Sequence, residues 1–158
     1  MHYNTVKIKK YVDHIEEFIA NAAIKPGMVV ELMTTGKVRA HATSGGHVLP
    51  MIALEDELQG KGIDDAYAAT DPVQVWVPVR GEIFYGIVAD GQLGVQKGDF
   101  LTSNGDGTLR VTLDSSDDDA KAPGRFVGIS LDELRLDGSG SESSWGGSLY
   151  PRVRVMVL

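Results

Sequence analysis

The side chains in this sequence that could most readily act in catalysis or bind a metal are four histidines, because the chain contains no cysteine. The absence of cysteine excludes a thiol nucleophile, a disulfide framework and a thiolate zinc site. No His-Glu-x-x-His motif occurs, and His41 and His47 lie on either side of a turn with no carboxylate near them in the sequence. We therefore interpret the histidines as exposed or hydrogen-bonded side chains rather than as metal ligands. They are His2, His14, His41 and His47.

The serines and carboxylates also lack the spacing of a known catalytic or ligand-binding motif. No serine occupies a Gly-x-Ser-x-Gly elbow, and Ser139 to Ser148 form a flexible Gly/Ser-rich stretch. The adjacent acids Asp64 and Asp65 lack the alternating ligands and the terminal glutamate of a calcium loop. The glycines between 104 and 107 are not followed by the Lys-Ser/Thr of a phosphate-binding loop. The sequence therefore predicts a protein that is not an enzyme and that holds neither a metal nor a cofactor.

Charge and hydropathy narrow the range of partners. The formal net charge is −7, which disfavours nucleic acid because affinity for phosphates depends on Lys and Arg. Positive charge is concentrated at Lys7, Lys9 and Lys10, with no acid among the first ten residues. The N-terminus lacks the apolar run of a signal peptide, and no stretch approaches the roughly 20 apolar residues of a membrane span. These features predict a soluble protein made in a cytoplasm, with no membrane and no nucleic acid as partner.

The elements that position these side chains are predicted to be short strands. The 158 residues include 19 glycines, and 42% of the residues are hydrophobic, which is typical of a domain with one core and many tight turns. Valine alternates strictly at 73, 75, 77 and 79, so all four valines should face the core while Trp76 faces the other side. Alternating valines between 153 and 157 predict a final strand that completes the sheet.

Two stretches of the chain share one pattern. Ile24-Lys25-Pro26-Gly27-Met28-Val29-Val30 resembles Val95-Gln96-Lys97-Gly98-Asp99-Phe100-Leu101, and a glycine turn follows each at the same distance, at Gly36 and Gly107. Each copy reads as a glycine turn, a strand, a hairpin and a second strand, which cannot bury its apolar face alone. The sequence therefore predicts a mainly β fold, a compact β-barrel or barrel-like sandwich built from two similar hairpin units.

The N-terminal part has a different pattern from the rest. Val6 and Ile8 alternate with lysines as in a half-exposed strand, whereas Tyr11, Ile15 and Phe18 recur at helical spacing. We expect an N-terminal arm over residues 1–23, with a short strand followed by a short helix. Residues 24–158 should form the β-barrel-like domain, with loop insertions at about 114–122 and 137–148.

Several short motifs resemble those of the head decoration proteins, or capsid cement proteins, of tailed bacteriophages. The resemblance covers roughly residues 22–113 and the last strand. The motifs are Ala23-Ile24-Lys25-Pro26-Gly27, Gly36-Lys37-Val38, Ala53-Leu54-Glu55, Gly62-Ile63-Asp64-Asp65-Ala66-Tyr67, the strand from Val73 to Gly81, and Val95-Gln96-Lys97-Gly98-Asp99. The loops at 114–122 and 137–148 have no counterpart in this pattern.

The resemblance implies a β-barrel-like body on the outer surface of an expanded phage head, assembled in the host cytoplasm. It further implies a homo-oligomer, with a trimer favoured, and the major capsid protein as the partner of the N-terminal segment. The alternation at the N-terminus offers an edge that can add a strand to a partner sheet, and the lysines can steer docking. The candidate capsid-binding residues are Val6, Lys7, Ile8, Lys9, Lys10 and Tyr11.

Three alternatives to this interpretation remain open at the level of sequence. The chain is also compatible with a tail or neck β-domain. A barrel that binds carbohydrate or another ligand is a further alternative, with Trp76, Tyr67 and the candidate surface aromatic Trp145 stacking on the ligand. Finally, residues 1–23 could complete the core of the domain itself, because Tyr11, Ile15 and Phe18 are apolar side chains.

Overall fold

The structure is a computed structural model that describes residues 3–89, 94–112, 124–134 and 150–158. Regular structure in these residues is almost entirely β-strand, with one turn of 3-10 helix at Glu57–Gln59, which confirms the predicted mainly β fold. No helix within the described ranges is long and apolar enough to cross a membrane. The strands are β1 (Lys7–Lys9), β2 (Ile15–Ile19), β3 (Val30–Leu32), β4 (Val38–Ala40), β5 (Ile52–Ala53), β6 (Pro72–Trp76), β7 (Ile83–Ile87), β8 (Phe100–Ser103), β9 (Leu109–Val111), β10 (Phe126–Ser130) and β11 (Arg152–Val157).

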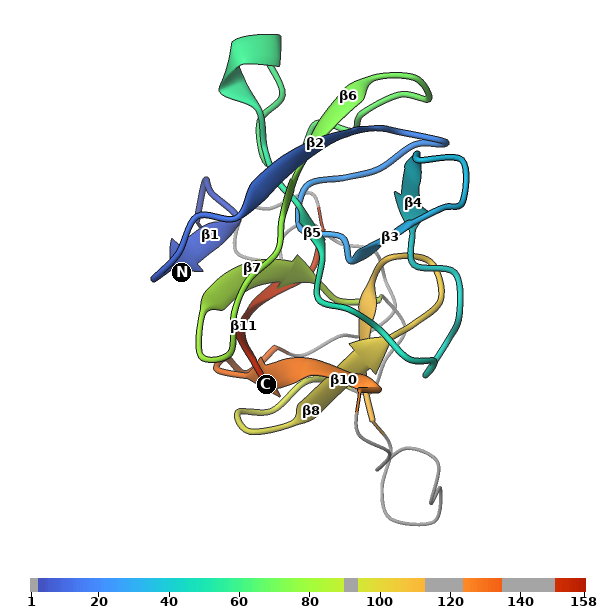
Figure 1. The fold of residues 1–158 in the computed structure, drawn as a ribbon. Helices are drawn as coiled ribbons and strands as arrows, with labels where there is room; N and C mark the ends of the chain where they lie inside the picture. The colour runs from blue at the N-terminus through green and yellow to red at the C-terminus, as the bar shows by residue number, and fades with distance from the viewer. Residues whose placement is uncertain (1–2, 90–93, 113–123, 135–149) are drawn as a thin grey trace.

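The strands form two units that follow one another along the chain. In the first unit, residues 15–76, the spatial order is β2-β6-β5-β3-β4, and a bridge between Val29 and Ile52 joins its two sheets. In the second unit, residues 83–157, the order is β7-β11-β10-β8-β9 within one sheet, and β1 is added next to β7. The first unit lies above the second in Figure 1. The two units therefore have the same strand order.

The hairpins of the two units also have the same register. Val30 pairs with Ala40 between β3 and β4, and Leu101 pairs with Val111 between β8 and β9. Each hairpin is preceded by a glycine with positive φ and contains another in its turn, where a side chain would be strained. These glycines are Gly27 and Gly36 in the first unit and Gly98 and Gly107 in the second. The predicted pair of similar hairpin units is therefore confirmed.

The equivalence extends to strands that the sequence pattern did not include. Ile15 of β2 pairs with Trp76 of β6, just as Ile83 of β7 pairs with Met156 of β11. In each unit a parallel bridge then connects the first strand of the order to the last, so that the unit curls into a barrel-like body. These bridges join Ala20 to Val38 and Val88 to Leu109.

Strand β2 replaces the short helix that was expected after Asp13. Its five residues all pair in register with β6, and these pairs supply the backbone hydrogen bonds that a helix would have supplied internally. Phe18 pairs with Val73 and packs against the core of the first unit, whereas the preceding residue, Glu17, points away from this core and is exposed. The helical spacing of three apolar residues was too short a signal to outweigh this tertiary pairing.

Strand β6 is buried on both faces, which the alternating valines predicted only in part. Val73 and Val75 have no exposed surface and belong to the core of the first unit. Trp76 is equally buried on the opposite face. Val79 is 40% exposed, because the strand ends at Trp76 and the alternation continues into a loop. Strand β6 thus lies between two apolar cores.

The outer face of the first unit is covered by the second unit. Three buried residues lie side by side on this face: Val29, just before β3, bridges to Ile52 of β5, which pairs with Trp76 of β6. None of them has exposed surface. They cluster with residues that form the core of the second unit, such as Leu101 and Val155. The two units therefore share a continuous apolar interior and pack as one body.

Candidate functional site

The candidate capsid-binding segment is partly built into the body of the protein. Val6 has no exposed surface; its N–H donates to Glu55 Oε2 at 3.0 Å and its carbonyl accepts from the Tyr85 N–H at 2.8 Å. Lys7 and Ile8 are half-buried in β1, which pairs with β7 at the edge of the six-stranded sheet. Within the described residues, no strand pairs with the other side of β1. The Val6 side chain is thus unavailable to a partner, whereas no described strand occupies the outer edge of β1.

The second half of the same segment is exposed and charged. Lys9, Lys10 and Tyr11 are all exposed, and the Lys9 ammonium lies 5.4 Å from the centre of the Tyr11 ring. Lys10 and Lys7 both pair with Asp13, and these ion pairs lower the pKa of the Asp13 carboxyl below its ordinary value. The positive charge of this segment is therefore partly neutralised within the chain, while Lys9 forms no ion pair with the described residues.

A buried carboxylate fixes the end of this segment. Glu82 has no exposed surface, and its two oxygens accept hydrogen bonds from the backbone N–H groups of Tyr11, Val12 and Val79. Burial acts to raise the pKa of Glu82, but the bonds from Val12, Tyr11 and Val79 outweigh it, so that the pKa lies below its ordinary value. The exposed residues 9–11 are therefore held in a defined position relative to the sheet.

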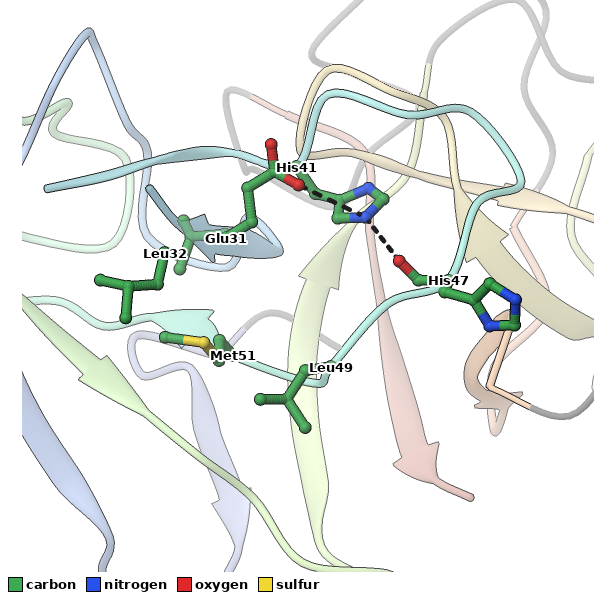
Figure 2. Close-up of a pocket in the computed structure, with 7 residues that line it drawn as sticks. Glu31, Leu32, His41, His47, Leu49 and Met51 are labelled. Carbon is green, nitrogen blue, oxygen red and sulfur yellow. Dashed lines mark hydrogen bonds and ion pairs between the residues drawn. The ribbon is translucent and has the colours of Figure 1, made fainter. Parts of the chain in front are cut away.

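A shallow hollow of about 260 Å³ opens on the first unit between β3 and the segment that precedes β5. Figure 2 shows Leu32, Leu49 and Met51 together on one side of it. Leu32 is 53% exposed and Leu49 is 65% exposed, so the apolar rim faces solvent. His41 and Glu31 form its polar side. The hollow could accommodate a small apolar side chain of a partner.

The polar side of the hollow links the two units through hydrogen bonds of His41. The His41 Nε2 donates to the His47 carbonyl at 3.1 Å, while Nδ1 lies 2.7 Å from Ser103 Oγ of the second unit. Glu31 Oε2 is 3.7 Å from Nε2, which is an ion-pair distance rather than a hydrogen bond. Ser103 has no exposed surface, so its hydroxyl cannot reach a substrate. The histidine is therefore hydrogen-bonded, as the sequence predicted for His41.

A second link between the units comes from Arg152, which is only 4% exposed. Its guanidinium donates to the carbonyls of Pro26 at 2.8 Å and Ile63 at 2.6 Å, and lies 3.4 Å from Asp64. Burial lowers the pKa of this group, and the neighbouring Asp64 carboxylate opposes that effect. Asp64 thus takes part in an ion pair between the two units.

The aromatic side chains proposed for ligand stacking are placed as follows. Trp76 and Tyr67 have no exposed surface, and the Tyr67 hydroxyl donates to the Leu54 carbonyl at 2.7 Å. Neither ring can stack on a carbohydrate from this position. Trp145 and the loops at 114–122 and 137–148 lie outside the described residues. Among the residues that are described, no group of three or more His, Asp or Glu side chains could hold a metal ion.

Sequence reasoning missed the two residues that organise this region, Glu82 and Arg152. Both are charged residues inside strand or turn patterns, where solvent exposure is the ordinary expectation. Their backbone partners lie up to 126 residues away in the sequence, so no local spacing predicts the role of Glu82 or Arg152. Only the alternation of Arg152 with buried valines in β11 hinted that a charged residue lies next to a core.

No protein-family model matches this chain, and no curated protein matches it. Among solved structures, the chain is similar to the N base of the head fiber gp8.5 in bacteriophage phi29. The TM-score is 0.56, the match covers 93% of this chain and 95% of that chain, and 13% of the residues are identical. At this level of identity, the similarity establishes a shared fold over nearly the whole of both chains.

Proposed function

We propose that this protein is a non-enzymatic structural component of a phage virion that binds the outer surface of the head and stabilises the capsid lattice. The observation that carries this proposal is the fold, which is similar over 93% of the chain to the base of a phage head fiber. The short motifs that resemble those of head decoration proteins support the same role.

The body of the molecule suits such a role. The two units share one interior and are tied by buried polar links through His41 and Arg152, so the protein should move as a rigid block. A rigid block that contacts neighbouring capsid subunits stabilises the assembled shell, because each contact is lost when the subunits separate. No chemical step is needed for this function.

We propose that the capsid contact is made by Lys9, Lys10 and Tyr11 together with the free edge of β1. This edge can pair with a strand of the major capsid protein through main-chain hydrogen bonds. The exposed lysines would face an acidic surface of the partner, so binding should weaken as salt is added. Val6, which was a candidate from the sequence, acts indirectly in this proposal by anchoring β1 to the sheet.

Co-sedimentation with purified expanded heads tests the function and the contact separately. The wild-type chain should sediment with heads, whereas a Lys9→Glu/Lys10→Glu double variant should lose most of this binding. A Lys37→Glu/Arg80→Glu variant has the same change in charge at positions outside the N-terminal segment and should bind normally.

Failure of the wild-type chain to bind heads of its own phage would overturn the proposed function. Equal binding by both double variants would leave the function intact but would show that the N-terminal segment is not the contact. A turnover that depends on a single His, Asp or Glu would contradict the non-enzymatic assignment.

A further inference from the structure

The same sheet face is buried in one unit and exposed in the other. Phe100 of β8 occupies the position that Val29 occupies in the first unit, because Phe100 pairs with Ile129 as Val29 pairs with Ile52. Val29 has no exposed surface, whereas Phe100 is 49% exposed. Ile129 and its neighbour Met156 are partly exposed, while their counterparts Ile52 and Trp76 are fully buried. We call Phe100, Ile129 and Met156 the open face.

The turns beside these faces show the same difference. Both Gly27 and Gly98 have positive φ and occupy equivalent positions before β3 and β8. The Arg152 side chain and the Tyr85 carbonyl of the second unit lie directly against Gly27. Among the described residues other than its two neighbours in the chain, no atom lies within 4 Å of the position that a Cβ would take on Gly98. The open face is thus the counterpart of an interface that this fold already makes, and no described part of the chain takes the place of the covering unit.

The existing interface shows which surface covers such a face. The second unit contributes the outward side of β7 and β11, where the Ile87 N–H donates to the Gly27 carbonyl at 3.3 Å. It also contributes the turn of its hairpin, where the Gly107 carbonyl accepts from the Val29 N–H at 2.8 Å. In the first unit, the counterparts of Ile87 and Gly107 are Ile19 and Gly36.

These counterparts are accessible. Ile19 is 41% exposed and Gly36 is exposed. In the part of the chain that the structure describes, no atom beyond the adjacent residues lies within 4 Å of the position of a Cβ on Gly36. Exposed Glu17 lies two residues before Ile19 and takes the place of Tyr85, which covers the first unit. The first unit therefore carries an unused covering surface, formed by β2 and the hairpin turn at Gly36.

We propose that the open face binds the first unit of a second copy of this chain, in a head-to-tail arrangement that repeats the contact between the two units. Charge favours this occupant. Tyr85 lies against Gly27, the residue after Pro26, and Glu17 and Lys97 take the places of Tyr85 and Pro26, so the contact would bring Glu17 of one copy near Lys97 of the other. The contact is heterologous, since it joins two different surfaces, and can therefore close into a ring. This inference is independent of a role in the virion.

A charge-reversal cycle on the full chain tests the pairing directly. Self-association is measured by sedimentation velocity over a range of protein concentrations. Glu17→Lys and Lys97→Glu should each weaken it about tenfold, because each places like charges opposite one another. The double variant Glu17→Lys/Lys97→Glu should restore association to near the wild-type level. Both side chains are exposed, so neither change should affect folding.

The open face itself is tested with Phe100→Glu, which should weaken association by about tenfold or more. Val12→Glu is the matched control, since Val12 is 43% exposed, close to the exposure of Phe100, and follows β1 at the opposite edge of the six-stranded sheet from β8 and β9; it should have no effect on association. A wild-type chain that remains monomeric up to about 1 mM would overturn the proposal. Association that responds to Phe100→Glu but to neither charge reversal would also overturn it, because the partner surface would then not be β2.

Discussion

The Glu82 carboxylate accepts a hydrogen bond from the backbone N–H of Val12 at 2.9 Å, which joins positions 70 residues apart in the chain. Through this bond and those from Tyr11 and Val79, one buried side chain orients the exposed N-terminal segment on the second unit. A structural role of this kind predicts an effect on stability first and on binding second.

Replacing Glu82 with Gln should destabilise the fold by about 2 kcal/mol, because a neutral amide loses the charge-assisted bonds and turns an NH₂ group toward a backbone donor. Denaturant unfolding of the full chain measures this difference. Glu57→Gln, which changes an exposed glutamate, is the control and should leave the unfolding free energy unchanged. Equal stability of Glu82→Gln and the wild type would show that the carboxylate is not an anchor.

Acid should remove the contribution of Glu82. Its pKa is lower in the folded than in the unfolded chain, so its stabilising effect is fully present above the unfolded value of about 4.3 and disappears as the pH falls through the folded value. The pKa of Asp132, whose carboxylate lies 2.6 Å from the Arg154 guanidinium, is also lowered, because the hydrogen bonds from Arg154 outweigh the effect of burial. Unfolding curves recorded between pH 7 and about pH 3 should therefore converge for wild type and Glu82→Gln. A gap that widens toward acid pH would contradict the assignment.

Strand β6 offers a matched test of the core. Val75→Asp places an unpaired charge in the core of the first unit and should cost several kcal/mol, against a typical total of about 5–15 kcal/mol. Gln74→Asp introduces the same side chain at a half-buried neighbour and should be mild. Thermal melts followed by circular dichroism distinguish them, and similar losses at both positions would show that the faces of β6 are wrongly assigned.

The two equivalent glycine turns provide a measure of how tightly the units pack. Gly27→Ala and Gly98→Ala should each cost about 1 kcal/mol of backbone strain, because both positions have positive φ. Gly27→Ala should lose about 1–3 kcal/mol more, since its methyl group would press on Arg152 and on the Tyr85 carbonyl. Denaturant unfolding of the two variants gives the difference, and equal losses would mean that the units do not press together at Gly27.

Deletion of residues 1–20 should abolish cooperative folding. It removes β2, which pairs with β6 along its whole length, and Val6, which is buried in the shared interior. Deletion of residues 1–5 ends just before Val6 and should leave a folded protein. Near-ultraviolet circular dichroism and size-exclusion chromatography would show the contrast. A cooperative melt for the longer deletion would restore the view that these residues form an independent arm.

The sequence predicted the β class and the two hairpins because their signals are local. A glycine at a position of positive φ, such as Gly36 or Gly107, determines a turn with help from only a few neighbours. Strand β2 could not be predicted in this way. Its spacing of Ile15 and Phe18 fits a helix as well as a strand, and the pairing with β6 that decides between them joins residues far apart in the chain.

The placement of the N-terminal candidate residues could be predicted only in part. Lys9 is exposed, as its alternation with Val6 and Ile8 suggested, but Val6 faces the interior, where β7 and Glu55 take up its backbone groups. Likewise, the four alternating valines at 73–79 correctly placed Val73 and Val75 in the core. They gave no sign that Trp76, on the other face, would be equally buried, because its cover comes from a second unit that the pattern of β6 does not encode.

The position of β1 has a consequence for the order in which the chain can fold during synthesis. The first unit spans residues 15–76 and emerges from the ribosome before the second unit, so Trp76 and Ile52 emerge before their cover does. Strand β1 is synthesised before the other described strands, yet its only partner among them is β7, which is made later. The start of the chain must therefore wait for the second half, and a nascent chain arrested near residue 80 should be prone to aggregate until its own later sequence covers it.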